Sequence, residues 1–175
     1  LIHAFDGNIW AFDPLTGQGR RLISDLASDA YAGEPAISPD GNTLAFTIVV
    51  VPAPNPSAAP SERTLPGSDI WLMNSDGSNR RLLFTHDRPG VLIEMPYWTP
   101  DGKAIVYTYS APILGPDGRY TGSIRELQRL DVTTGQRTTL VKDGEDAAFS
   151  SAGGATPFAY ILTDPQTYEQ SLWVA

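Results

Sequence analysis

The fold is decided by a stretch that the chain uses twice, PAISPDGNTLAF at residues 35–46 and PYWTPDGKAIVY at residues 96–107. The shared Pro-Asp-Gly has the chemistry of a tight turn, because proline presets φ, aspartate caps the local backbone and glycine accepts a positive φ. The residues after each turn are mostly apolar, β-branched or aromatic, which is typical of strands. Two strands joined by so short a turn are expected to be antiparallel neighbours.

A second motif recurs between these stretches. It reads IWAFD at residues 9–13, IWLMN at residues 70–74 and LQRLD at residues 127–131, and it begins again as LWVA at residues 172–175. Each of the first three copies precedes a glycine-containing turn and then a short segment that begins with arginine and reaches a leucine. The alternation of the two motifs predicts a repeating unit of antiparallel strands.

The spacing of the second motif indicates the architecture. Successive copies begin 61, 57 and 45 positions apart, and two inserted loops, residues 52–67 and 112–122, account for the longer intervals. A core repeat of about 45 residues with four strands matches one blade of a β-propeller. The sequence therefore predicts an all-β chain, a single propeller segment over residues 1–175. Its predicted blades are a partial one at 1–23, whole ones at 34–84 and 94–142, and a partial one at 147–175.

The paired motifs also carry a family resemblance. Ser-Pro-Asp-Gly at residues 38–41, followed by Ile-Trp-x-x-Asn-x-Asp-Gly at residues 70–77, resembles the WD40-like (PD40-type) repeats of the TolB-like β-propeller family. Similar repeats occur in the propeller domains of prolyl-oligopeptidase-like enzymes. The fourth repeat departs from the pattern, because residues 149–154 keep an aromatic residue and glycines but lack Pro-Asp-Gly.

The resemblance implies a bacterial protein of the periplasm or the cell exterior, and it leaves room for a membrane tether in residues outside this segment. TolB itself carries a separate α/β domain before its propeller. That domain is absent from these residues, so its partner contacts are not carried over to this chain.

The repeat pattern predicts an open set of blades. With strands lettered A to D from the axis to the rim, the chain is expected to begin at strand B of one blade and to end at strand C of another. A closed propeller has roughly four to eight complete blades. We therefore expect that the native polypeptide continues into further blades, the alternative being self-association of two copies to close the ring.

Composition excludes several classes of function. The chain has 12 Lys and Arg residues against 20 Asp and Glu residues, a formal charge of −8, so nucleic-acid binding is not expected. The lack of cysteine excludes disulfides and thiolate metal ligands, and the two histidines, His3 and His86, are too few for a histidine-based metal site. No apolar run approaches the roughly 20 residues that span a bilayer. The sequence predicts no cofactor, no metal and no membrane span in this segment.

One face of the blades is expected to bind a partner. Strand alternation places both insertions and the connections between blades on the same face, and these loops are rich in acidic residues. The candidate partner-binding residues there are Asp25, Asp29, Glu34, Asp87, Asp143, Glu145 and Asp146. We expect an acidic surface suited to a basic protein segment or a cation, the alternative being ordinary solvated loops.

The proline-rich insertion offers a second candidate. It should favour an extended polyproline II conformation, which can dock into an aromatic groove of a partner. The residues concerned are Pro52, Pro54, Pro56 and Pro60. The alternative is a stiff surface loop without a partner.

The sequence gives no sign of a catalytic site within these residues. It has no Gly-x-Ser-x-Gly elbow. The expected function is therefore a non-enzymatic propeller that serves as a protein-interaction or scaffold module, with a protein partner or other subunits of an assembly. Two alternatives remain, the non-catalytic propeller of a larger prolyl-oligopeptidase-like hydrolase and a carbohydrate- or ligand-binding propeller. The four tryptophans, Trp10, Trp71, Trp98 and Trp173, are expected in the core rather than on a sugar-binding surface.

Overall fold

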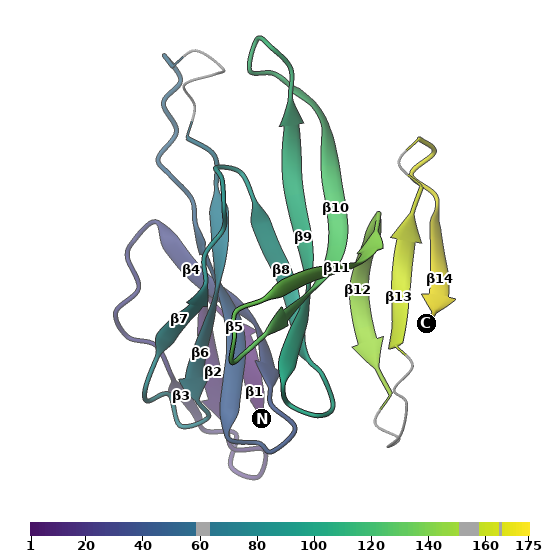
Figure 1. The fold of residues 1–175 in the computed structure, drawn as a ribbon. Coiled ribbons are helices and arrows are strands. Elements are labelled where there is room, and N and C mark those ends of the chain that lie inside the picture. Colours follow the sequence, from purple (N-terminus) through teal and green to yellow (C-terminus); the bar gives the residue numbers. More distant parts are fainter. Residues whose placement is uncertain (59–63, 151–157, 165) are drawn as a thin grey trace.

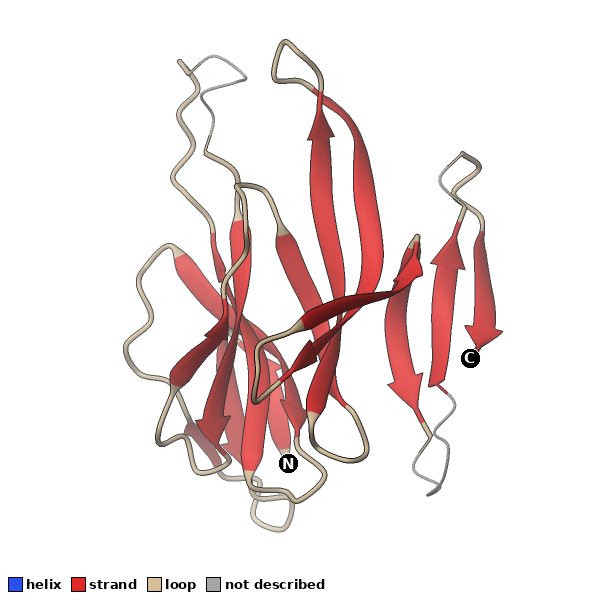
Figure 2. Cartoon of the chain, viewed as in Figure 1, coloured by secondary structure: helices blue, strands red, loops and turns tan. Residues whose placement is uncertain are grey.

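The chain folds into four antiparallel sheets that follow one another in sequence (Figures 1 and 2). The structure is a computed structural model, and it describes residues 1–58, 64–150, 158–164 and 166–175. No helix long and apolar enough to span a membrane is present in the part of the chain that it describes. The prediction of an all-β chain built from antiparallel sheets is confirmed.

Each sheet is an up-and-down meander, because consecutive strands are hydrogen-bonded neighbours. The first sheet contains β1 (Ile2–Phe5), β2 (Asn8–Phe12) and β3 (Gly19–Arg21). The second contains β4 (Ala30–Ile37), β5 (Thr43–Val50), β6 (Gly67–Asn74) and β7 (Arg81–Phe84). The third contains β8 (Leu92–Trp98), β9 (Ala104–Leu114), β10 (Tyr120–Asp131) and β11 (Arg137–Lys142). The fourth contains β12 (Gly144–Phe149), β13 (Phe158–Thr163) and β14 (Gln170–Val174).

The Pro-Asp-Gly turns form as their chemistry predicts. In the β8–β9 turn, Asp101 accepts hydrogen bonds from the Thr99 hydroxyl at 2.6 Å and from the Lys103 amide at 3.0 Å. Gly102 follows with a φ of 68°, in the left-handed region that favours glycine. The β4–β5 turn is built in the same way around Asp40. These local bonds fix the reversal of the chain and hence the register of the strands on either side.

The core lies between the sheets. The first strand of each of the last three sheets, here called an inner strand (β4, β8 and β12), packs on strands of the preceding sheet. Thus β4 contacts β1 and β2, β8 contacts β5 and β6, and β12 contacts β9 and β10. The largest fully buried side chains are Tyr107, Phe46, Ile9, Ile23, Leu44, Ile70, Leu72, Met73, Ile93, Ile105, Leu127 and Leu130. Burial of both sheet faces explains why β5 and β9 are nearly continuous apolar runs.

Hydrogen bonds also join neighbouring sheets. The buried Ser68 hydroxyl on β6 donates to the Ile93 carbonyl on β8 at 2.8 Å and accepts a hydrogen bond from the Ile93 amide. Nearby, the Trp98 indole donates to the Ala36 carbonyl on β4 at 3.1 Å. These bonds satisfy polar groups that would otherwise be buried without partners, and they are specific to the junction between the second and third sheets.

The structure differs from the sequence-based expectation at a few boundaries. The inner strand β4 begins at Ala30 and β8 begins at Leu92, somewhat before the predicted starts of those blades. The insertion at 112–122 is mostly strand, since β9 reaches Leu114 and β10 resumes at Tyr120, so it is a long hairpin rather than a loop. The alternation of apolar and polar residues there is weak, which is why sequence reasoning did not recognise the extension.

The tryptophans occupy several environments. Trp71 and Trp98 pack against the buried clusters between sheets. Trp10 is stacked on Phe12, with ring centroids 6.0 Å apart, and Trp173 is 50% exposed. The expectation of a core position therefore fits Trp71 and Trp98 better than Trp173.

Candidate functional site

A bulge interrupts each of the inner strands β4, β8 and β12 at an equivalent position. The strand register shifts between Gly33 and Ala36, between Glu94 and Tyr97, and between Glu145 and Ala148. Inside the bulges, the residues with a positive φ are Glu34 at 54°, Met95 at 50° and Asp146 at 54°. A residue with a side chain pays roughly 1–2 kcal/mol to adopt this conformation. Bulges of this kind re-aim side chains and are frequent next to functional sites.

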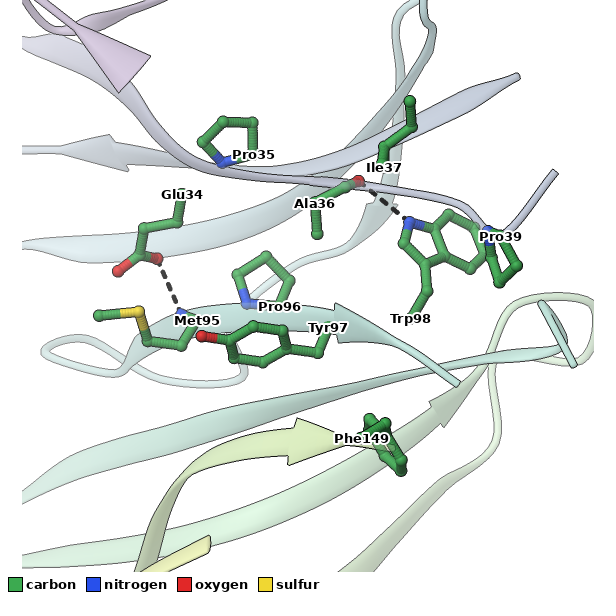
Figure 3. Close-up of a pocket in the computed structure, with 10 residues that line it drawn as sticks. All are labelled: Glu34, Pro35, Ala36, Ile37, Pro39, Met95, Pro96, Tyr97, Trp98 and Phe149. Atoms are coloured by element: carbon green, nitrogen blue, oxygen red, sulfur yellow. Dashed lines mark hydrogen bonds between the residues drawn. The ribbon is translucent and has the colours of Figure 1, made fainter. Parts of the chain in front are cut away.

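Hydrogen bonds hold the bulges in place. The Glu34 carboxylate accepts a hydrogen bond from the Met95 amide at 2.9 Å, which joins the bulges of β4 and β8 (Figure 3). The same carboxylate accepts from the Thr47 hydroxyl at 3.1 Å. In the next junction, the Asp146 amide donates to the Thr108 hydroxyl at 3.2 Å. The bulges of β8 and β12 are therefore each hydrogen-bonded to a strand of the preceding sheet.

Four acidic side chains gather around the bulges, and we call them the inner-strand carboxylates: Glu34, Glu94, Glu145 and Asp146. Burial raises the pKa of Glu94, and the charges of the other three raise it further, against the opposing effect of Arg125. Burial also raises the pKa of Glu34, with a smaller contribution from Asp146. Hydrogen bonds from Met95 and Thr47 act in the opposite direction on Glu34. These effects on Glu34 and Glu94 indicate that the carboxylates lie close enough to interact.

Among the residues that the structure describes, one cation is paired directly with the cluster. Arg125 on β10 forms an ion pair with Glu145 at 2.7 Å, and the Glu145 side chain is only 13% exposed. The Thr163 hydroxyl and the Gln170 amide donate to the other oxygen of Glu145, at 2.6 Å and 3.1 Å. Both oxygens of Glu145 are thus engaged within the protein, while the Glu94 carboxylate has no hydrogen-bond partner among the described residues. The cluster keeps an excess of negative charge that a positively charged group could offset.

An apolar groove of about 370 Å³ adjoins the carboxylates. Figure 3 shows its walls, which come from β4 and β8 together with Phe149 of β12. Burial raises the pKa of the Tyr97 hydroxyl, with further contributions from Asp146 and Glu34. Met95, which is 40% exposed, lies beside the ring of Tyr97. The site therefore combines an apolar wall, a phenol and a carboxylate cluster, a set suited to binding rather than to bond cleavage.

The structure brings together three of the acidic residues that the sequence singled out, Glu34, Glu145 and Asp146. Sequence reasoning missed Glu94, although its place just before the bulge residue matches that of Glu145. The signal that could have found it is the alignment of the inner strands, in which Glu94 and Glu145 occupy the same position of the repeat.

The other predicted acidic residues lie apart from this cluster. Asp25 is held by two hydrogen bonds from Arg80, at 2.7 Å and 2.8 Å. Asp87 accepts from the Tyr109 hydroxyl at 3.1 Å and from Arg137 at 3.2 Å. Asp29 is exposed. Asp143 has a positive φ of 57°, and its amide donates to the Arg125 carbonyl.

The proline-rich insertion is only partly described. Pro52 and Pro54 lie in a segment without regular structure, and Pro56 lies in a turn closed by a hydrogen bond from the Ala58 amide to the Asn55 carbonyl at 3.2 Å. Because of this turn, an extended conformation does not continue past Pro56. Pro60 lies outside the described residues.

One pair resembles part of a catalytic triad. His86 Nδ1 lies 2.7 Å from an oxygen of Asp69, the contact that orients a catalytic histidine. The other ring nitrogen faces Gly67, where an added Cβ would lie only 2.7 Å from Nε2. Nε2 thus packs against the backbone of Gly67, and no described serine or threonine hydroxyl is hydrogen-bonded to it. Among the described residues no cluster of His, Asp and Glu side chains is arranged to hold a metal ion.

Comparisons with known proteins identify similar chains. No protein-family profile matches the chain. Over 107 residues, 61% of its length, it is 29% identical to a protein of Bacillus subtilis (strain 168) named uncharacterized peptidase YuxL, of which it covers 13%. Among solved structures, Porphyromonas gingivalis dipeptidyl peptidase 4 matches 97% of this chain and 28% of its own, with a TM-score of 0.60 and 10% identity.

Two further solved structures share the fold, with similar TM-scores and sequence identities. Acylaminoacyl peptidase of Pyrococcus horikoshii has a TM-score of 0.57 and 12% identity, and the match covers 95% of this chain and 26% of that one. Hydrazine synthase of Kuenenia stuttgartiensis has a TM-score of 0.55 and 16% identity, over 90% of this chain and 46% of that one. At these identities the structural matches establish the β-propeller fold alone, and the chain spans less than half of each of these proteins.

The prediction of a β-propeller is confirmed, while the narrower TolB-like assignment stays a prediction. The expectation of a non-enzymatic protein is wrong, because the relative that the chain matches in sequence is named as a peptidase and points to a peptidase-related protein. That expectation rests on the lack of a Gly-x-Ser-x-Gly elbow. A propeller segment lacks such an elbow whether or not it is joined to a hydrolase domain, so its absence from these residues does not exclude an enzyme.

Proposed function

We propose that these blades are part of the non-catalytic propeller domain of a peptidase, and that their inner strands contact the peptide substrate. The observation that carries the proposal is the 29% identity over 107 residues to a protein named as a peptidase. The chain covers 13% of that relative, so the hydrolysing groups belong to other parts of the polypeptide.

The inner-strand carboxylates give this role a physical basis. The inner strands of a propeller line its central channel, so their side chains meet whatever enters it. Glu34, Glu94 and Asp146 provide negative charge that no ion pair within the described residues neutralises, and the adjoining groove provides an apolar surface. A peptide with a positively charged residue next to an apolar one matches both features. The propeller would then select peptides before they reach the hydrolytic centre.

Kinetics of the natural polypeptide test the proposal. The polypeptide that contains these residues should hydrolyse peptide p-nitroanilides, and it should prefer a lysine-containing substrate to its glutamate counterpart. Glu94→Gln should raise KM for the lysine substrate several-fold and leave kcat nearly unchanged, because the contact is the same in the ground state and the transition state. Asp29→Asn removes the same charge from an exposed position outside the cluster and serves as the matched control.

Failure can occur at two levels. A natural polypeptide that hydrolyses no peptide substrate and contains no hydrolase domain would overturn the proposal as a whole. Peptide hydrolysis with equal KM values for wild type and Glu94→Gln would retain the peptidase and reject the role of the inner strands.

The remaining sequence-based expectations stay predictions. A periplasmic or extracellular location can be checked by fractionating cells that express the natural polypeptide. Recruitment of a basic partner by the acidic loop residues can be checked by reversing the charges of Asp143 and Asp146 and measuring the loss of a bound protein.

A further inference from the structure

A second cleft lies at the other end of the strands from the Pro-Asp-Gly turns, between the two inserted segments. Figure 1 shows the described parts of both insertions projecting from the same side of the molecule, at the top of the view. Residues from three parts of the chain converge there, within 65–66, 88–90 and 112–120, and they enclose a volume of about 1000 Å³. Their closeness is visible at Gly90, where an added Cβ would lie 2.8 Å from both Leu65 and Pro112. The floor of the cleft is therefore close-packed.

The walls of the cleft are apolar and accessible. Tyr120 is 67% exposed and Leu114 is 45% exposed, and the two are paired across the tip of the β9–β10 hairpin. Leu65 and Pro112 continue the apolar surface toward the floor. Large apolar side chains grouped around a cleft are typical of a binding surface rather than of free solvent exposure.

The charge of the cleft is opposite to that of the chain. Of the described residues that line it, the charged ones are Arg88 and Arg119, in a protein with a formal charge of −8. The Arg119 side chain is 79% exposed, and its contact with Asp117, at 3.4 Å, is a surface pair of little strength. Arg88 lies beside the Tyr109 hydroxyl and forms no ion pair with any described carboxylate. Both guanidinium groups can therefore donate hydrogen bonds to a carboxylate of a ligand.

The geometry points to a docking site for an extended acidic segment of a partner protein. Carboxylates of the segment would pair with Arg88 and Arg119, and an apolar or aromatic side chain between them would pack on Leu114 and Tyr120. A nucleic acid would also satisfy the two arginines, but it carries a negative charge on every nucleotide. A chain of charge −8 therefore repels it more strongly than a peptide segment with two carboxylates. This inference is independent of the proposed peptidase, and it assigns to this part of the loop face an acidic partner, not the basic one expected from the sequence.

Fluorescence anisotropy with the natural polypeptide tests the docking site. The probe is a fluorescein-labelled peptide, Glu-Leu-Pro-Glu-Phe with an amidated C-terminus, and its counterpart carries lysine in place of both glutamates. We expect the acidic probe alone to bind, with an affinity that falls as salt is added. Arg88→Gln and Arg119→Gln should each weaken binding about tenfold, and Tyr120→Ala several-fold. Lys103→Gln removes the same charge from an exposed position at the opposite end of the strands, and it should leave binding unchanged.

Several results would overturn the docking site. They are equal binding of the two probes, no detectable binding of the acidic probe, or arginine variants that bind it as tightly as wild type. Displacement of the probe by a single-stranded oligonucleotide of equal charge, at equal concentration, would reject the peptide as the ligand. Unchanged melting temperatures of the variants, whose replaced side chains are exposed or form the cleft wall, would show that any loss of binding reflects lost contacts.

Discussion

Met95 occupies the strained position of the bulge in β8, with a φ of 50°. Its side chain is 40% exposed, so little packing depends on it. We expect Met95→Gly to be more stable than Met95→Ala by about 0.5–1 kcal/mol, because glycine adopts this conformation without strain and pays only for its flexibility in the unfolded chain. Urea unfolding of the two variants measures the difference. Equal stabilities would mean that the bulge relaxes when the methionine is removed.

The ionisation of Glu94 supplies a second prediction at the scale of the residue. Because burial and the charges of its neighbours raise its pKa above 4.5, the folded state binds this proton more tightly than the unfolded state does. The contribution of Glu94 to the free energy of unfolding is complete at pH values below its pKa in the unfolded chain. It is lost as the pH rises through its pKa in the folded protein. Glu94→Gln should therefore raise the urea midpoint near neutral pH and have no such effect at about pH 3.5.

Asp40 provides a comparison, because its pKa is shifted in the opposite direction to that of Glu94. Hydrogen bonds from Ser38 and Asn42 lower its pKa below 3.8, so its contribution is present above that value and is lost as the pH falls through the folded pKa. Asp40→Asn should lower the urea midpoint near neutral pH, and the difference should shrink toward about pH 3. The same pH response in both variants would contradict this assignment of the two shifts.

The hairpin turns belong to the scale of the element. Gly102 has a φ of 68°, whereas Gly122 in the β9–β10 hairpin does not have a positive φ, and an added Cβ would make only an ordinary contact at either position. Gly102→Ala should therefore destabilise the protein by about 1 kcal/mol, and Gly122→Ala by less than about 0.5 kcal/mol. Chemical unfolding midpoints of the two variants check this difference. A larger loss of stability in Gly122→Ala than in Gly102→Ala would contradict this prediction. It would indicate that the β8–β9 turn tolerates a side chain and the β9–β10 hairpin does not.

The same elements show what sequence reasoning can reach. The turns and the strands beside them were predictable because Pro-Asp-Gly acts through bonds within a few residues. The bulges were not predictable from the sequence. Their residues with a positive φ are glutamate, methionine and aspartate, and none of these residue types indicates that conformation by itself. Their conformation depends on partners in other strands, such as Thr47 and Thr108. For the same reason, the sequence pointed to three of the inner-strand carboxylates but not to their assembly with Glu94.

Packing between sheets sets the stability of the whole molecule. Ile93 on β8 is completely buried in the cluster between the second and third sheets. Ile93→Ala should cost about 2–5 kcal/mol, and Ile93→Val about 0.5–1.5 kcal/mol, because the cavity grows with each methyl group that is lost. Urea unfolding measures both losses, and hydrogen exchange of amides in β5 and β8 reports whether the two sheets loosen together. A cost below 1 kcal/mol for Ile93→Ala would mean that the sheets close up around the cavity.

The hydrogen bonds at the bulges have a consequence for how similar blades find their correct order. Repeat proteins are prone to misassembly, because one repeat can occupy the place of its neighbour during folding. Here the last two junctions use different partners: the Glu34 carboxylate accepts from the Met95 amide between the second and third sheets, and the Asp146 amide donates to Thr108 between the third and fourth. A blade in the wrong place would lose these hydrogen bonds. The bulges thus favour the correct order of blades that are otherwise similar enough to exchange places.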